Sequence, residues 1–317
     1  FFANANTFTR PISNACCRRI DFFRFWCLMP CPCPVPLPRL RPEDTPDGYY
    51  TFGLQSLRVV TKFRIPLWGE TEMFGGHVAR SANITVYPDT RLAAEQPLGV
   101  EGGWLSQVQA GLITDSRNHE IAPTQGVYSE FSVRGSHPYL GSDWSMWGFN
   151  ATDRRYLSLG NRDLVLALRE AVDLQRGEVP FFHQMVMGGS QWVDIGGPLA
   201  MRGLPIGRYR GEWTLYGDAE LRWGVTEFST RRSNFRLFLV SFVGGARIIE
   251  PGEADCGVHV HAGGGGGPRL LYNEVFMVRM DLTAGREEYT DPSTPLGKTV
   301  TDRGWVPGLY LAFSAPY

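Results

Sequence analysis

The fold of this chain is decided by the stretch Trp213-Thr-Leu-Tyr-Gly-Asp-Ala-Glu-Leu-Arg-Trp223, in which two kinds of side chain alternate. The two faces carry, in turn, Trp213, Leu215, Gly217, Ala219, Leu221 and Trp223, and Thr214, Tyr216, Asp218, Glu220 and Arg222. Successive side chains of a β-strand point to opposite faces of a sheet, so this alternation predicts a strand with one apolar and one polar face.

Three further segments, 163–174, 273–282 and 308–317, show the same alternation. Each is about 10 residues long, the length of a tilted strand that crosses a bilayer, whereas strands of soluble sandwiches typically have about 5–6 residues. Followed along the chain, the pattern predicts eleven strands. They lie near 50–64, 72–88, 103–117, 126–136, 143–157, 163–175, 212–224, 235–248, 257–267, 272–285 and 305–317.

The connections between these predicted strands fall into two classes of length. The long ones lie near 89–102, 176–211 and 286–304. The short ones lie near 65–71, 158–162 and 268–271. A membrane barrel has long loops outside and tight turns on the periplasmic side, whereas a soluble sandwich has no reason to sort its loops in this way. The chain is therefore predicted to be all-β, a transmembrane antiparallel β-barrel.

Composition and charge exclude several classes of function. The 317 residues carry 31 basic and 32 acidic side chains, a net charge of −1, so we expect no nucleic-acid partner. No apolar run approaches the ~20 residues of a membrane-spanning helix. No Gly-x-Ser-x-Gly motif is present, and His259 and His261 have no further ligands at metal-binding spacing. We expect neither an enzyme nor a bound metal or cofactor.

Residues 1–46 differ from the rest of the chain. They contain five of the six cysteines and alternating prolines from Pro30 to Pro38, which exclude a helix or an inner strand. Basic and apolar residues near Arg18 resemble a signal peptide, but Asp21 and Arg24 interrupt the apolar part. We therefore predict a disordered or non-native leader over 1–46 and a barrel domain over 47–317.

Several motifs in the barrel part resemble those of one known family. The first two are Gly196-Gly-Pro-Leu-Ala-Met-Arg-Gly-Leu-Pro-Ile-Gly-Arg-Tyr-Arg210, followed by Ala219-Glu-Leu-Arg222, and Asp115-Ser-Arg-Asn-His-Glu-Ile-Ala-Pro-Thr-Gln-Gly126. The others are Gly177-Glu-Val-Pro-Phe-Phe182 and the terminal Gly-Leu-Tyr-Leu-Ala-Phe-Ser-Ala-Pro-Tyr. In order and spacing they are similar to the bacterial surface antigen barrels, the superfamily of outer-membrane protein assembly factors and two-partner-secretion transporters.

The resemblance implies a fold, a location and a function. The family barrel has sixteen strands, with an inward-folded loop, here between residues 176 and 211, after the eleventh. Five predicted strands follow this loop and six precede it, so we expect eleven or twelve strands here and a domain that lacks its first ones. The implied role is insertion or translocation of proteins at the bacterial outer membrane, with lipids and client polypeptides as partners. A passive pore or a structural barrel is the alternative.

The resemblance also implies which residues form the site. The loop motif is Arg202, Gly203 and Leu204, and its partner on the lumen wall is Glu220, which the alternation separately places on the polar face. The family usually has an aspartate where this chain has Gly244, in Phe242-Val-Gly-Gly-Ala246, so the usual locking of the loop is in question. A solvated Arg202 is the alternative to a locked one.

The end of the chain carries a second signal. Gly308, Tyr310, Phe313 and the terminal Tyr317 resemble the pattern that barrel assembly machinery reads by pairing it with an edge strand. An ordinary last strand is the alternative interpretation, and the two are compatible.

Overall fold

The computed structural model describes residues 51–160, 163–249, 260–290 and 300–313. The predicted leader, 1–46, lies outside these residues. Within them the chain is almost entirely β-strand, with one short α-helix, α1 (Arg91–Glu95), and one 3-10 turn at Pro138–Leu140. The predicted all-β fold is therefore confirmed.

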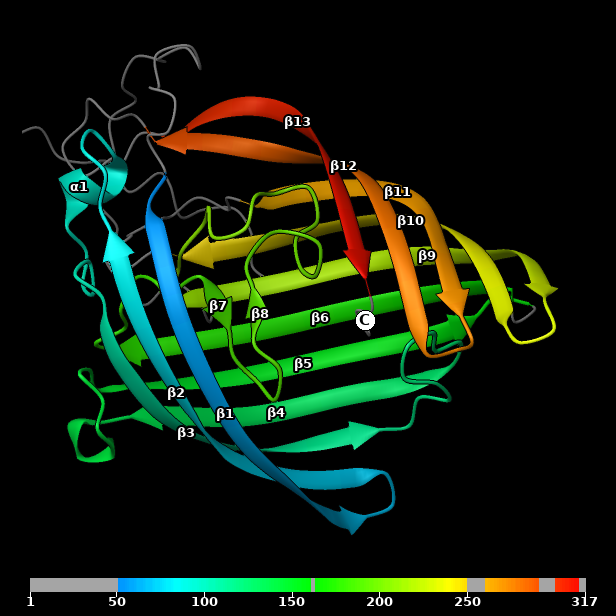
Figure 1. The fold of residues 1–317 in the computed structure, drawn as a ribbon, viewed down its shortest axis with the longest axis horizontal. Coiled ribbons are helices and arrows are strands. Elements are labelled where there is room, and N and C mark those ends of the chain that lie inside the picture. The colour runs from blue at the N-terminus through cyan, green and yellow to red at the C-terminus, as the bar shows by residue number, and fades with distance from the viewer. Residues whose placement is uncertain (1–50, 161–162, 250–259, 291–299, 314–317) are drawn as a thin grey trace, which may run out of the picture. The chain divides into compact units, whose positions relative to one another are not determined.

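Eleven strands form one sheet in which neighbours in the sequence are neighbours in space (Figure 1). They are β1 (Gly53–Trp68), β2 (Thr71–Thr85), β3 (Gly103–Asp115), β4 (Gly126–Ser136), β5 (Met146–Ser158), β6 (Leu164–Gly177), β9 (Trp213–Ser229), β10 (Asn234–Ile249), β11 (His261–Tyr272), β12 (Phe276–Thr290) and β13 (Val300–Phe313). Each strand is antiparallel to the next, the up-and-down order of a membrane barrel sheet. Two very short strands, β7 (Val186–Met187) and β8 (Val193–Asp194), pair with each other between β6 and β9.

The turn predicted at 268–271 is wrong. Strand β11 continues through Pro268, which lies opposite Leu239 of β10, and the chain turns instead at Asn273 and Glu274, whose φ angles are 49° and 59°. Pro268 has no N–H to donate, and the pairing of β11 with β12 is interrupted beside it. The proline therefore marks an irregularity inside a strand, which sequence reasoning took for a turn.

Connections of different length lie at opposite ends of the strands. Tight turns join β1 to β2, β9 to β10 and β11 to β12 at one end. At the other end, α1 lies in the connection from β2 to β3, and the long segment 178–212 joins β6 to β9. The connection predicted at 286–304 is shorter, because β12 extends to Thr290 and β13 begins at Val300.

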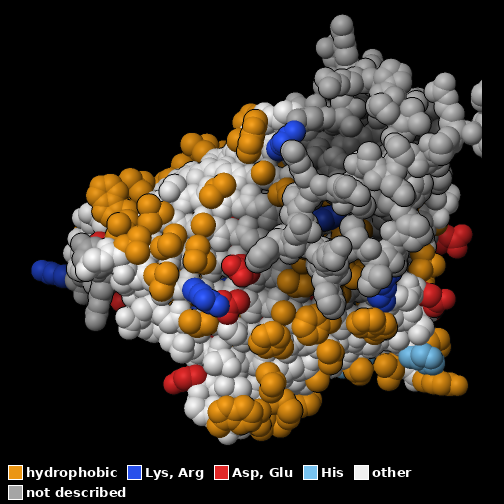
Figure 2. All heavy atoms as spheres, turned by 180° about the vertical axis from the view of Figure 1, so that it is seen from behind, with side chains coloured by type: hydrophobic (Ala, Val, Ile, Leu, Met, Phe, Trp, Pro, Cys, Tyr) orange, Lys and Arg blue, Asp and Glu red, His pale blue; other side chains and the backbone are white. Residues whose placement is uncertain are grey.

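The outer face of the sheet carries exposed hydrophobic side chains. Leu221 of β9, Leu282 of β12 and Leu309 of β13 are 39%, 60% and 63% exposed. Figure 2 views the molecule from behind and shows hydrophobic side chains spread over that face, with few charged ones between them. No helix of the described residues has the length and apolar character needed to span a membrane. The strands therefore present the lipid-facing surface expected of a barrel wall.

The inner face of the sheet is polar and is covered by the segment 178–212, which we call the inner loop. Figure 1 shows β7 and β8 of this loop on the concave side of the sheet. Tyr216, Glu220 and Arg222 of β9 point to this side and are buried, as the alternation in the sequence predicts. Polar side chains that would face water in an empty barrel are thus enclosed between sheet and loop.

The two faces of β12 should respond differently to a charge. Leu282→Arg places a cation among outer hydrophobic side chains and is expected to destabilise the barrel by about 2–4 kcal/mol if it lies near the bilayer midplane. The measurement is the urea dependence of heat-modifiable gel mobility in lipid vesicles. Leu159→Arg, in the turn after β5, is the matched control and should stay within about 0.5 kcal/mol of the parent. Equal destabilisation by both substitutions would contradict a lipid-facing β12.

Candidate functional site

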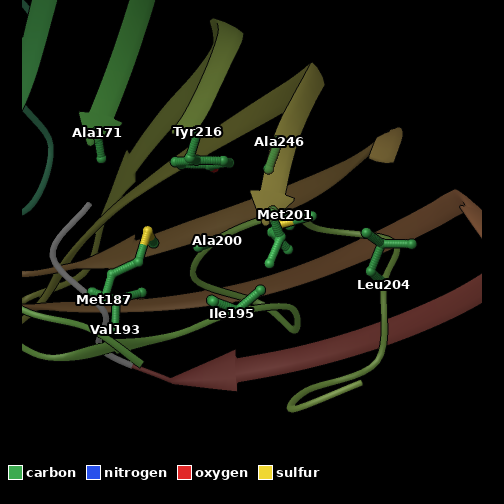
Figure 3. Close-up of a cluster of buried hydrophobic side chains, with 10 residues drawn as sticks. Ala171, Met187, Val193, Ile195, Ala200, Met201, Leu204, Tyr216 and Ala246 are labelled. Atoms are coloured by element: carbon green, nitrogen blue, oxygen red, sulfur yellow. The ribbon is translucent and has the colours of Figure 1, made fainter. Parts of the chain in front are cut away.

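An apolar cluster packs the inner loop onto the sheet. It comprises Met187, Val193, Ile195, Ala200, Met201 and Leu204 of the loop and Ala171, Tyr216, Ala246 and Ile248 of β6, β9 and β10 (Figure 3). Burial of these side chains excludes water from the contact and stabilises the docked loop. The loop is therefore part of the core between the strands and is not a solvated excursion.

Arg202 of this loop is buried, with 3% of the residue exposed, and three groups of the sheet hold its guanidinium. Nη1 donates to Glu220 Oε2 at 2.5 Å, and Nη2 donates to Asp218 Oδ2 at 3.0 Å. The Phe242 ring centroid lies 3.5 Å from Cζ, in the position of a cation–π contact. The structure thus brings Arg202 and Glu220 together, and it places Arg202 away from solvent.

Glu220 is the centre of a larger charged network. Its carboxylate also accepts from Arg222 Nε at 2.6 Å and from Arg269 Nη1 and Nη2 at 2.6 and 2.7 Å. Arg279 of β12 donates to Asp281 at 3.0 Å and to the Pro198 carbonyl of the inner loop. Charges buried in this way are tolerated because each guanidinium has a carboxylate or carbonyl acceptor.

Glycines give the loop motif its close approach to the strands. Gly203 has a φ of 109°, and a Cβ there would lie 2.8 Å from the Ala284 carbonyl oxygen. On the strand side, a Cβ on Gly263 would overlap the Arg202 carbonyl oxygen, and one on Gly285 would overlap that of Gly203. The five-glycine run that begins at Gly263 therefore faces the packed loop, and a larger residue at these positions would push Arg202 out of place.

Asp218 stands where the missing family aspartate would act. Gly244 of β10 lies directly opposite Asp218 of β9, and a Cβ on Gly244 would come within 2.7 Å of the Asp218 Cβ. The two positions therefore compete for the same space beside Arg202. In this chain the carboxylate comes from β9, and glycine on β10 leaves room for it. We call Asp218, Glu220, Phe242, Gly263 and Gly285 the Arg202 seat.

The last strand also takes part in holding the loop motif. Tyr310 Oη donates to the carbonyl oxygen of Leu204 at 3.0 Å, and the Leu204 side chain is 1% exposed. Phe313 points outward and is 60% exposed, whereas Tyr317 lies outside the described residues. The predicted targeting residues are thus divided, since Tyr310 faces the inner loop and Phe313 faces the surface that meets lipid.

His183 is an uncharged group enclosed by the loop. It is 1% exposed, its ring lies 5.0 Å from that of Trp192, and neither ring nitrogen has a hydrogen-bond partner among the described residues. Burial, together with the positive charges of Arg134 and Arg80, holds the pKa of His183 well below its usual range. Among the residues that the structure describes, no group of three or more His, Cys, Asp or Glu could hold a metal ion.

Sequence reasoning missed several residues of this site. Asp218 was on the predicted polar face, two residues before Glu220, and this spacing could have identified it as a second partner. The seat in Gly263 and Gly285, and the bond from Tyr310, depend on contacts between strands and a loop distant in sequence. No local pattern signals such contacts.

A carboxylate exchange tests the position of Asp218. Asp218→Gly removes one acceptor of a buried guanidinium and is expected to destabilise the docked loop by about 1–3 kcal/mol. Gly244→Asp alone should also destabilise, because two side chains would crowd one space. The double variant should recover most of the loss, measured by urea unfolding in lipid vesicles. A double variant as unstable as the worse single variant would show that the two positions are not equivalent.

His183 should make the docked loop sensitive to acid. Because its folded pKa is lowered, the stability it permits is present above the unfolded pKa of about 6.5 and is lost as pH falls below that value. His183→Leu should flatten the decline in urea stability between about pH 7 and pH 5. The exposed His137, substituted by Asn, should leave the decline as in the parent. An unchanged decline in His183→Leu would contradict this role of the buried imidazole.

Comparison with known proteins agrees with this architecture. Residues 77–193 match the family model described as the Omp85 superfamily domain. No curated protein sequence matches the chain. The crystal structure of BamA from Haemophilus ducreyi lacking POTRA domains 1–3 is similar, with a TM-score of 0.51 and 13% sequence identity over 83% of this chain. The match covers 55% of that BamA chain. LpxR from Salmonella typhimurium gives a TM-score of 0.31 at 8% identity over 80% of this chain and 87% of its own, too low to indicate a shared fold.

These findings confirm the resemblance drawn from the motifs. The sheet has the fold of the BamA barrel, and the Omp85 match runs from β2 into the inner loop. Together they indicate the bacterial outer membrane as the location. The chain carries an Omp85 superfamily domain within a BamA-like outer-membrane barrel sheet.

Proposed function

We propose that this protein inserts or translocates polypeptides at the bacterial outer membrane. The Omp85 domain and the BamA-like sheet support the general class, and the docked inner loop is the observation that carries the specific role. A passive pore has no need of a loop fixed to its wall by a guanidinium that two carboxylates and an aromatic ring hold. The proposed role needs neither a catalytic residue nor a cofactor.

The partners follow from the surfaces of the sheet. Lipid is the partner of the outer face, where hydrophobic side chains such as Leu282 and Leu309 are exposed. Client polypeptides would pair with strand edges, since main-chain hydrogen bonds of an edge strand can template a new strand. The last strand, with Gly308 and Phe313, would be read by barrel assembly machinery when the protein itself is assembled. The matched length of BamA is partial, so activity and partners together form the proposal.

Reconstitution with an Arg202 variant tests this function. Arg202→Ala leaves Asp218 without its guanidinium partner and Glu220 with two of three, and we expect it to destabilise the docked loop by about 3 kcal/mol. Client assembly in liposomes, measured as protease-resistant folded client, should then fall at least about tenfold. Arg155→Ala removes an exposed arginine that pairs with Asp153 on the outer face, and it should retain parental activity.

Two outcomes would contradict the proposal. Unchanged client assembly by Arg202→Ala, with the loop shown to be released, would separate the docked loop from the function. Steady conductance across planar bilayers with no effect of the parent protein on client folding would favour a passive pore.

A further inference from the structure

The inner loop meets the sheet at a second place, far along the sheet order from the Arg202 seat. The tip between β7 and β8, residues 188–192, lies against β4, β5 and β6, whereas the Arg202 seat is on β9 to β12. The contacts here involve the residues Glu130 and Arg134 of β4 and Asp173 of β6. None of them belongs to the loop motif or to its partners described above.

Glu130 is a buried carboxylate whose donors come largely from the loop tip. The Ser190 hydroxyl donates to Oε2 at 2.5 Å, and the Ser190 backbone N–H donates to Oε1. Tyr128 Oη also donates to Oε2, at 2.7 Å. Within the described part of the chain no Lys, Arg or His forms an ion pair with Glu130, and the residue is 4% exposed. Without the loop tip, this charge would keep one hydrogen bond from the protein and would have to be solvated by water.

Asp173 binds the same tip from the neighbouring strand pair. It forms a two-pronged ion pair with Arg134, at 2.9 and 2.7 Å, in which both side chains are almost fully buried. The backbone N–H of Gly188 donates to Asp173 Oδ1 at 2.8 Å. Gln175 Nε2 donates both to Asp173, at 3.2 Å, and to the Val186 carbonyl oxygen, at 3.1 Å. The ion pair therefore accepts the backbone of the hairpin as well as its own side-chain partners.

The shape of the tip fits these carboxylates. A Cβ on Gly188 would overlap the Arg134 guanidinium, so a larger residue could not approach Asp173 as closely. Gly189 has a φ of 115°, and a Cβ there would lie 2.8 Å from Glu130 Oε1. Arg58 of β1 adds a cation–π contact over Trp192, with Cζ 5.2 Å from the ring centroid. Two glycines and one serine in sequence thus match two buried carboxylates.

We infer that the β7–β8 hairpin has its own docking site, formed by Glu130, Arg134 and Asp173, and that these are positioning residues for the inner loop. We call these three residues the hairpin seat. Each seat carries its own charged groups, so the two can open separately. Release of Arg202 frees the part of the loop near residue 200 and leaves the hairpin on β4 to β6. The loop therefore moves as two parts during client assembly, a step that rests on the proposed function, although the seat itself does not.

Cysteine accessibility can separate the two seats. In a background with the native cysteines replaced by serine, Met187→Cys reports on the hairpin and Ala200→Cys on the part near Arg202, since both residues are buried. The probe is the rate of maleimide labelling in lipid vesicles. Ser190→Ala and Glu130→Gln should each raise labelling at 187 about tenfold and leave labelling at 200 within about twofold. Arg202→Ala should give the opposite pattern.

Matched controls guard against general unfolding. Ser129→Ala removes a hydroxyl that donates to Asp153 at 2.5 Å on the outer side of β4, and it should change neither labelling rate. Should Glu130→Gln fail to fold, Ser190→Ala keeps the test open, because it removes a hydroxyl of the loop and leaves the sheet intact. Equal exposure of both reporters by every variant would overturn the inference of two seats, as would no exposure at 187 by either hairpin variant. Loss of client assembly with normal labelling patterns would speak to the proposed function alone.

Discussion

The structure depends on one constraint, which is that a guanidinium enclosed between loop and sheet must be paired. Arg202 is brought inside by the apolar cluster around Leu204, and its charge is then matched by Glu220 and Asp218. An uncompensated charge in that place would cost several kcal/mol, which is comparable with much of a protein's net stability. The polar inner face of β9 exists to meet this requirement, and the apolar outer face exists to meet lipid.

Backbone shape and charge are adjusted together at this site. Gly263 and Gly285 let the loop backbone lie directly on β11 and β12, which brings the guanidinium within reach of β9. Gly244 then gives space to Asp218 across the strand pair. An acceptor can therefore move between adjacent strands without loss of the ion pair, because facing positions of antiparallel strands point the same side chains to the same face. The departure from the family pattern preserves the interaction by a different residue.

The sequence predicted the strands well and the site in part, for physical reasons. Alternation such as that of Trp213 to Trp223 repeats every two residues, so it shows the faces of each strand directly. The pair of Arg202 and Glu220 was within reach of a motif, because both residues lie in one continuous stretch. Ser190 and Glu130, by contrast, are sixty residues apart, and nothing in either neighbourhood indicates the other. Pro268 misled the turn prediction because a missing N–H is tolerated where a strand pair is already interrupted.

The inner loop connects strands near both ends of the sheet order. Arg80 of β2 donates to the Phe182 carbonyl oxygen at 3.2 Å, and Tyr310 of β13 donates to that of Leu204 at 3.0 Å. Between these contacts the loop is held on β4 and β6 by Glu130 and Asp173 and on β9 by Glu220. A change in the distance between β2 and β13 must therefore break one of these contacts or bend the loop. The curvature of the sheet and the state of the loop are coupled through hydrogen bonds at named atoms, and neither can change alone.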